Sequence, residues 1–247
     1  MTNRLRVLGV IPARLNSTRL PRKVLRTICG RPMVQHVYER CRRCAKLDEV
    51  LVATDSDEVA AVCRQLRIPV EMTSPAHPSG TDRLFEVMGR RDGDIYVNIQ
   101  GDEPLVDPSQ LDALLEPFEA EQQTQVSTLR IAITAQEARN PNVVKVVCDA
   151  RGNALYFSRA PIPFDRDGKE PVQYFKHMGL YAYRRSVLKM FHSLPPSKLE
   201  MAERLEQLRF LDNGIRIRVL QTTIATVGVD TEDDLQAVEQ MLTRAAA

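Results

Sequence analysis

The sequence predicts an α/β protein with a mostly parallel central sheet flanked by helices. Short apolar runs alternate with amphipathic segments through the first half of the chain, which is the pattern of strands joined by crossover helices. The 247 residues, 43% of them hydrophobic, are enough to bury a substantial core. We therefore expect a single domain over residues 1–247, with a strand-rich insertion at 150–195.

In the first half, uninterrupted apolar runs predict buried strands, and stripes of apolar residues predict helices packed on them. Asp107 followed by Pro108 predicts a capped helix with proline at its first position. The expected elements are strands at 5–11, 49–54 and 94–99, a helix at 31–46, a helix carrying Val59, Val62 and Leu66, and a helix that contains Leu111, Leu114, Leu115 and Phe118.

In the second half, the texture changes near residue 150, where short strand-like runs are separated by proline-rich and polar loops. Ser197 and Glu200 form a capping-box pattern, and the helix they open is expected to end at Asn213-Gly214. The last helix should start at Thr231, because three acidic residues follow it. The expected strands are 126–133, 143–148, 154–158, 178–183 and 215–220.

Charge and composition narrow the class of function. The chain has 34 basic and 32 acidic residues, a net charge of +2, which argues against a general binder of nucleic acid. No run approaches the roughly 20 apolar residues that cross a bilayer, and the N-terminus lacks a signal-peptide pattern. Five cysteines, an odd number, make a disulfide framework unlikely and fit a cytoplasmic protein; Cys41 and Cys44 lack a second pair at zinc-ligand spacing.

The loop after the first strand concentrates cations and hydroxyls at the carboxyl end of a parallel strand, where open α/β sheets bind ligands. Polyphosphate binding requires cations, hydroxyls and backbone N–H groups, and this loop could supply all three. It matches neither the Walker pattern nor a dinucleotide fingerprint, and charge of this kind is also typical of a solvated surface loop. The residues concerned are Arg14, Ser17, Thr18, Arg19, Arg22 and Lys23.

Two aspartates are expected at other strand ends. Asp102 follows the strand at 94–99 beside Gly101, and Asp230 precedes the last helix. Magnesium typically takes one or two carboxylates together with phosphate oxygens, so the pair predicts a Mg²⁺ site. The alternatives are a simple turn at Asp102 and a helix cap at Asp230.

A fourth segment, residues 77–83, is a glycine-containing turn that opens a helix. Its hydroxyls and N–H groups suit a base or ribose, and it equally suits an ordinary loop with Ser79 or Thr81 as the helix cap.

These segments together resemble one family, the 3-deoxy-manno-octulosonate (Kdo) cytidylyltransferases. The resemblance extends nearly from end to end, and its ordered series is far more specific than any single motif. The matching stretches are 11–14, 17–21 with Lys23, 53–55, 79–83, 100–104, 156–163, 177–183, 205–209 and 228–231.

The resemblance implies a Rossmann-like nucleotidyltransferase that forms CMP-Kdo and pyrophosphate from CTP and Kdo for lipopolysaccharide biosynthesis, with Mg²⁺ as cofactor. It implies catalytic roles for Arg14, Lys23, Asp102 and Asp230, the two aspartates as metal ligands. It places Arg14, Ser17, Arg19, Lys23, Ser79, Arg83 and Gln100 at the nucleotide. It places Gln100, Arg159, His177, Tyr181, Glu206 and Gln207 at the acid sugar.

One departure from the family pattern concerns the first loop, where Arg22 and Val24 stand in place of the usual glycine and proline. If the backbone has φ > 0 at residue 22, arginine strains the loop there, although its side chain could add a phosphate contact.

Three further points follow from the resemblance. A cytidylyltransferase for 8-amino-Kdo is the open alternative. A sialic acid enzyme is disfavoured because its first loop is richer in glycine, and a silent nucleotide-binding module is disfavoured because Arg14, Lys23, Asp102 and Asp230 are all present. A homodimer is expected, formed partly through the strand edges of the insertion.

Overall fold

The structure, a computed structural model, describes residues 4–15, 19–77, 79–168 and 172–246. The chain forms two compact units, one from Met1–Asp112 with Thr226–Ala247 and one from Ala113–Ala225. The predicted insertion at 150–195 lies within the second unit.

The first unit is built on a parallel sheet, as predicted. Its strands run in the order β6-β1-β4-β5 and pair in parallel throughout. Three of them fall where the apolar runs placed them, and β5, a short strand of half-buried residues, was not predicted. The bounds are β1 (Val7–Pro12), β4 (Glu49–Thr54), β5 (Val70–Met72) and β6 (Ile95–Asn98).

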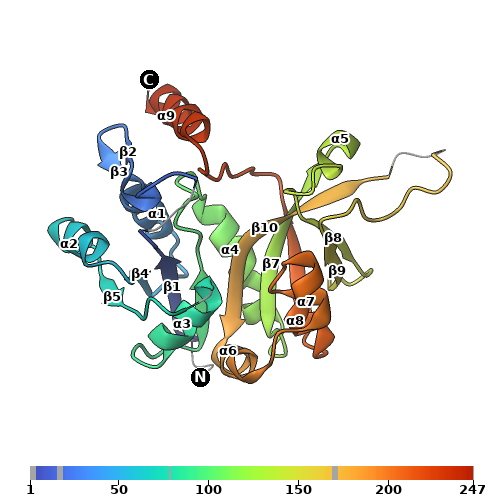
Figure 1. Cartoon of the computed structure of the whole chain (residues 1–247). Coiled ribbons are helices and arrows are strands. Elements are labelled where there is room, and N and C mark those ends of the chain that lie inside the picture. The colour runs from blue at the N-terminus through green and yellow to red at the C-terminus, as the bar shows by residue number, and fades with distance from the viewer. Residues whose placement is uncertain (1–3, 16–18, 78, 169–171, 247) are drawn as a thin grey trace. The chain divides into compact units, whose positions relative to one another are not determined.

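Helices flank this sheet (Figure 1). Ser56 and Ser79 cap α2 and α3 by accepting hydrogen bonds from the backbone three residues on. The bounds are α1 (Met33–Cys41), α2 (Asp57–Gln65), α3 (Gly80–Met88), α9 (Glu232–Ala246) and the 3₁₀ turn η1 (Lys23–Leu25), while α4 (Pro108–Ala120) runs from the first unit into the second.

The prediction of a helix over 31–46 was too long at both ends. Arg31 and Pro32 form β3 (Arg31–Pro32), which pairs with β2 (Thr27–Ile28) around the left-handed turn at Cys29 and Gly30. The backbone groups of Arg31 and Pro32 pair within this hairpin instead of within a helical turn, so α1 starts only at Met33. At the other end, single-turn hydrogen bonds over residues 42–44 close the helix.

The second unit carries a mixed sheet. β11 pairs with β7 in parallel, and β7, β10, β8 and β9 pair in that order in antiparallel fashion. β10 is longer than predicted and contains a register shift between Met178 and Tyr181, which marks a bulge. The bounds are β7 (Val126–Ile133), β8 (Lys145–Cys148), β9 (Ala154–Ser158), β10 (Tyr174–Arg184), β11 (Ile217–Thr222), α5 (Ala135–Ala138) and α6 (Arg185–Ser193).

The single helix predicted between Ser197 and Gly214 is two helices, α7 (Lys198–Glu203) and α8 (Leu208–Asp212). The capping box of Ser197 and Glu200 is present as expected, and Gly214 adopts the left-handed conformation after α8. Arg204, with φ 54°, ends α7 early. At this break the Arg159 side chain binds the carbonyls of Glu203 and Arg204.

No helix among the described residues has the length and apolar character needed to cross a membrane.

Candidate active site

The carboxyl ends of β1 and β6 bring two predicted site segments together in the first unit. The strands are direct parallel neighbours, and a Cβ added at Gly101 would lie 2.7 Å from the carbonyl oxygen of Pro12. The amide of Val229 donates to the carbonyl of Asp102 at 2.9 Å, so the segment before α9 joins them. Three stretches far apart in the sequence therefore meet at one edge of the sheet, as ligand sites of open α/β sheets require.

Lys23 lies between the two predicted metal ligands. Its Nζ donates to Oδ2 of Asp102 at 2.6 Å and to Oδ1 of Asp230 at 2.9 Å. Those two carboxylate oxygens can therefore be no further apart than the sum of these distances. Although burial opposes the charged form, Asp102 and then Asp230 raise the pKa of Lys23 above its ordinary value. Arg19 adds a second cation, with Nη1 3.1 Å from Oδ2 of Asp230.

Thr231 and Asp234, rather than Asp230, form the cap of α9. Thr231 accepts from the amide of Asp234, whose carboxylate accepts from the backbone of Asp230 and Thr231. This capping frees the Asp230 carboxylate to face the cations.

A hydrophobic cluster anchors the cationic loop beneath this charge cluster. Leu20, three residues before Lys23, packs with Val229, directly before Asp230, and both are buried. The remaining members come from β2, α1 and α9, which lie side by side in Figure 1; they are Ile28, Met33, Leu235 and Val238. Burial of this apolar surface fixes the cations opposite the carboxylates.

Arg22 adopts the conformation that the family's usual glycine favours. Its φ is 56° and its ψ 30°, in the left-handed region. The guanidinium pairs with Glu58 of α2. The backbone around Lys23 therefore keeps the conformation that a glycine at residue 22 would favour. The Arg22 side chain binds the Glu58 carboxylate of the protein itself.

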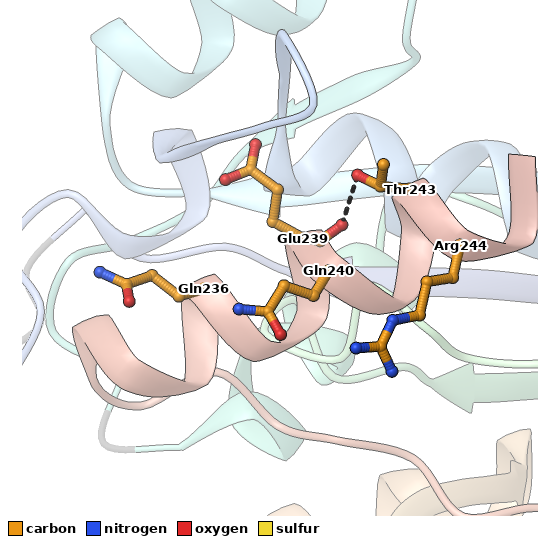
Figure 2. A pocket seen from close by; sticks show the side chains of 5 residues that line it. All are labelled: Gln236, Glu239, Gln240, Thr243 and Arg244. Atoms are coloured by element: carbon orange, nitrogen blue, oxygen red, sulfur yellow. Dashed lines mark hydrogen bonds between the residues drawn. The ribbon is translucent and has the colours of Figure 1, made fainter. Parts of the chain in front are cut away.

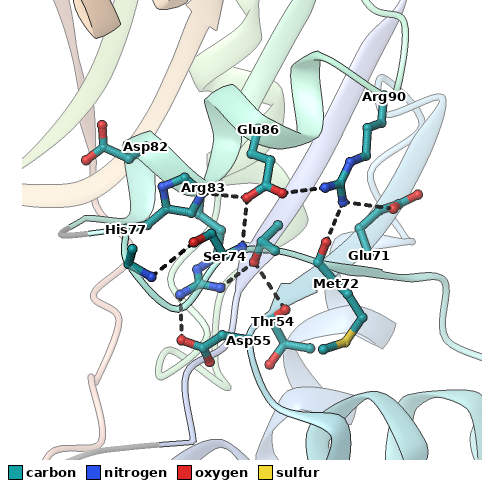
Figure 3. A network of polar contacts seen from close by, with 12 residues as sticks. Thr54, Asp55, Glu71, Met72, Ser74, His77, Asp82, Arg83, Glu86 and Arg90 are labelled. Atoms are coloured by element: carbon teal, nitrogen blue, oxygen red, sulfur yellow. Dashed lines mark hydrogen bonds and ion pairs between the residues drawn. The ribbon is translucent and has the colours of Figure 1, made fainter.

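Arg14 and the segment at 77–83 also converge. Nη2 of Arg14 donates to the carbonyl of His77 at 2.7 Å. Ser79 caps α3 through the amide of Asp82, so this part of the capping alternative is realised. Arg83 is fully buried, where it pairs with Asp55 at 2.9 Å and binds the hydroxyl of Thr73 (Figure 3).

Arg83 thereby joins the ends of β4 and β5 to α3. Its Nε has no hydrogen-bond partner among the described residues. Gln100 lies half-buried two residues after the end of β6, and Ser17 falls outside the described residues.

In the second unit, β10 carries two of the predicted sugar residues. The bulge of β10 lies between them, and the rings of His177 and Tyr181 are 5.2 Å apart. Burial, with a smaller effect of Lys176, lowers the pKa of His177 to about 3, so the ring is neutral. Thr128 Oγ1 lies 3.1 Å from His177 Nε2 and 2.8 Å from the carbonyl of Leu180. The Thr128 hydroxyl thus links the His177 ring to the backbone at the bulge.

Tyr181 and Gln207 hold buried polar atoms that lack partners among the described residues, the phenol oxygen and Nε2. Burial, then Tyr183 and Glu206, raises the pKa of Tyr181 well above its ordinary value. The Glu206 carboxylate is therefore close enough to Tyr181 to act on it electrostatically. Buried polar groups without partners are rare in proteins and are expected where a ligand supplies the partner.

Arg159 holds the break between α7 and α8. Its guanidinium donates to the carbonyls of Glu203 at 2.7 Å, Pro141 at 3.0 Å and Arg204 at 3.5 Å. The Glu203 carboxylate in turn accepts from Ser158 Oγ and the Arg159 amide. These contacts fix the turn that leads into Glu206 and Gln207.

Sequence reasoning missed three buried or half-buried charged residues that organise these segments. Glu86 binds the segment before α3, Glu203 binds the end of β9, and Lys145 is fully buried with its ammonium on three backbone carbonyls. Their signal is weak, because charged residues are ordinary in amphipathic helices, and a single lysine in a short strand forms no motif. A surface hollow on α9 (Figure 2) carries none of the predicted residues; it is lined by Gln236, Glu239, Gln240, Thr243 and Arg244.

The first unit therefore has the fold and the charge arrangement of a nucleotidyltransferase: cations and paired carboxylates at the carboxyl edge of a parallel sheet. The profile of the family described as cytidylyltransferase matches residues 8–217. A 3-deoxy-manno-octulosonate cytidylyltransferase from Acidobacterium capsulatum is 56% identical over 96% of this chain and 97% of its own length. One from Koribacter versatilis is 50% identical over 98% and 92%.

Solved structures agree with the sequence comparisons. The structure of CMP:2-keto-3-deoxy-manno-octonic acid synthetase complexed with CTP superposes with a TM-score of 0.94 at 46% identity, covering 97% of this chain and 99% of that one. A cytidylyltransferase from Leptospira borgpetersenii, 16% identical with a TM-score of 0.65 over 97% and 87%, shares the fold. This chain belongs to the cytidylyltransferase family and, within it, to the 3-deoxy-manno-octulosonate cytidylyltransferases.

Proposed function

We propose that this protein activates Kdo with CTP, giving CMP-Kdo and pyrophosphate. The anomeric hydroxyl oxygen of Kdo bonds to the α-phosphorus, the bond from that phosphorus to the bridging oxygen breaks, and the hydroxyl proton is released. Relatives that are about half identical over nearly the full length, and named for this activity, support the proposal. The observation in this chain that carries it is Lys23 held between Asp102 and Asp230.

The chemistry requires neutralisation, because both substrates are anions and charge builds on the departing pyrophosphate. Lys23, Arg19 and Arg14 supply positive charge from one loop, and positioning of such charges is the main source of catalysis in phosphoryl transfer. Arg14 is held on the carbonyl of His77, so this cation does not have to be ordered when CTP binds, and Lys23 lies beside the two carboxylates.

The residues present fit a magnesium ion. Asp102 and Asp230 offer hard oxygen ligands, and both contact the Lys23 ammonium. The position between the two carboxylates therefore already holds a cation. We propose that these two aspartates hold Mg²⁺. When bound, the ion would stabilise charge on phosphate oxygens and lower the pKa of the sugar hydroxyl.

The second unit would grip the acid sugar. The unpartnered Tyr181 hydroxyl and Gln207 Nε2 are buried groups that can bond to sugar oxygens, and the neutral His177 ring packs beside Tyr181. With its pKa near 3, His177 serves for binding and orientation, not as a general base at neutral pH.

The remaining expectations are a homodimer and a cytoplasmic enzyme that serves lipopolysaccharide biosynthesis. The dimer is supported by apolar side chains that face solvent on and after β9: Leu155 is 61% exposed and Phe164 85%. Size-exclusion chromatography with light scattering tests it. Leu155→Asp should give monomers if this edge is the interface, and a dimer that resists the change would place the interface elsewhere.

A pyrophosphate-release assay with CTP and Mg²⁺ tests the reaction. Kdo, 8-amino-Kdo and a sialic acid are compared as acceptors, and Kdo should be preferred. Release with 8-amino-Kdo or the sialic acid alone would overturn the substrate assignment.

The same assay tests the aspartates. Asp102→Asn and Asp230→Asn should each lower the rate by roughly 10² to 10⁴-fold, as for other groups that stabilise charge in the transition state. Asp233→Asn, an exposed acid of the first turn of α9, is the matched control and should retain activity. Undiminished release in either of the first two variants would refute its role.

A further inference from the structure

We infer that Glu86 is a positioning residue for CTP that acts through His77 and Arg14. This inference deepens the proposed function and rests on it in taking CTP as the ligand of Arg14. Glu86 lies on α3, outside every motif that the sequence analysis singled out.

Glu86 binds both ends of the segment 74–77, which precedes α3. Its Oε2 accepts from the amide of Ser74 at 2.8 Å and from Nε2 of His77 at 2.5 Å, and Oε1 accepts from Arg90. Figure 3 shows the carboxylate between His77 and Arg90. One carboxylate thus fixes both ends of the four-residue stretch 74–77.

The electrostatics keep this carboxylate charged. Although burial opposes it, the Ser74 amide, the His77 ring and Arg90 lower the pKa of Glu86. Hydrogen bonds to an ionised acceptor are stronger than neutral ones, so the contacts of Glu86 hold the segment 74–77 more firmly than ordinary loop contacts would.

His77 transmits the constraint to the first loop. Its ring is held by Glu86 at 2.5 Å, and its backbone carbonyl accepts from Nη2 of Arg14 at 2.7 Å. The position of that carbonyl sets where the Arg14 guanidinium lies. The Arg14 side chain has about four freely rotatable bonds and pairs with no carboxylate among the described residues, so this carbonyl is the contact that orders it before CTP arrives.

Glu71 offers a matched control in the same network. Its side chain is 19% exposed against 21% for Glu86, and it also faces Arg90, at 3.9 Å. Its close partner, however, is Arg91 at 2.7 Å, and it makes no contact with the segment 74–77 among the described residues. Loss of Glu71 therefore removes a comparable ion pair and leaves the path to Arg14 intact.

The test is a double-mutant cycle on CTP affinity, measured by isothermal titration of CTP with Mg²⁺ in the absence of Kdo. Glu86→Gln should raise the Kd roughly tenfold, the size expected for a lost charge-assisted contact that orders a ligand-binding group. Glu71→Gln should leave it within about twofold. In an Arg14→Ala background, Glu86→Gln should add less than about twofold, because the residue through which it acts is gone.

Steady-state kinetics give an independent readout. Glu86→Gln should raise KM for CTP by a similar factor and leave KM for Kdo unchanged, a split that general destabilisation would not produce. An effect of Glu86→Gln that equals that of Glu71→Gln, or that persists in full on the Arg14→Ala background, would overturn the inference. A wild-type protein that bound CTP yet formed no CMP-Kdo would refute the proposed acceptor and leave this cycle intact.

Discussion

The contact between the loops after β1 and β6 gives the sharpest prediction, and Gly101→Ala tests it. A Cβ at residue 101 would lie 2.7 Å from the Pro12 carbonyl oxygen and 3.5 Å from Cγ2 of Ile11. The carbonyl is part of the backbone at the end of the paired strand β1 and cannot rotate away, so one of the two loops has to move. Overpacking of this kind costs about 1–3 kcal/mol. For a protein of this size that corresponds to a fall in Tm of about 2–12 °C, at about 2–4 °C per kcal/mol.

The same shift should lower activity, because Asp102 directly follows the substituted residue and Arg14 is two residues beyond Pro12. Misplacement of reacting groups by about 1 Å costs on the order of 100-fold, so we expect kcat/KM to fall by about that factor.

Gly228→Ala is the control for this experiment. It lies two residues before Asp230, its added Cβ meets nothing within 4 Å, and its φ is outside the left-handed region. Differential scanning calorimetry and the pyrophosphate assay are run on both variants. If Gly101→Ala matched Gly228→Ala in Tm and in kcat/KM, the two loops would not be in the contact described, and the geometry of the charge cluster would be wrong.

Three further predictions concern single residues. Because Arg22 already has φ 56°, Arg22→Gly should keep kcat/KM and Tm close to wild type, whereas the β-branched Arg22→Val should lose about 1–2 kcal/mol; equal Tm values would refute the strain. The pKa of His177, about 3 in the folded state, lies below its ordinary 6.5, so the unfolded chain binds the proton first and stability should fall as pH drops from 6.5 toward 3. The slope is at most about 1.4 kcal/mol per pH unit, and Tm measured against pH should fall less steeply in His177→Gln. Lys145→Met should cost about 2–4 kcal/mol, because it removes the buried ammonium that three backbone carbonyls share, and Lys189→Met, at an exposed site, should be neutral; urea titration of both variants measures the difference.

Much of the fold could be predicted because buried strands leave a plain signal. The apolar run at 49–54 coincides with β4, and 126–133 and 154–158 coincide with β7 and β9. Prediction was wrong where tertiary pairing overrode local pattern. Arg31 and Pro32 directly precede a helical stripe and were predicted to open the helix, yet they form a hairpin strand with Thr27 and Ile28.

The position of Asp102 was predictable from topology, since residues that follow parallel strands meet at one edge. The expectation that Asp230 also follows a strand directly was wrong, because β11 ends at Thr222, and the Val229 amide on the Asp102 carbonyl brings this segment to the site. Asp102 and Asp230 do meet there, and the sequence could not show that Lys23 would bridge them, because that depends on the fold of the intervening loop. Glu86 was hidden for a different reason. It stands four residues before Arg90, the spacing of an ordinary surface pair on a helix, and that pair is present; the contacts to Ser74 and His77 come from outside the helix.

We propose that Arg159 serves both as scaffold and as a contact for the acid sugar. Its guanidinium engages three backbone carbonyls, and a guanidinium has more N–H groups than these contacts use. The predicted sugar substrate carries a carboxylate, and Arg recognises that group best when the fork is already fixed. In this proposal the backbone contacts of Arg159 order it for an anion, as the His77 carbonyl is proposed to order Arg14. In both units a backbone carbonyl holds the cation, which fixes its geometry without cancelling its charge.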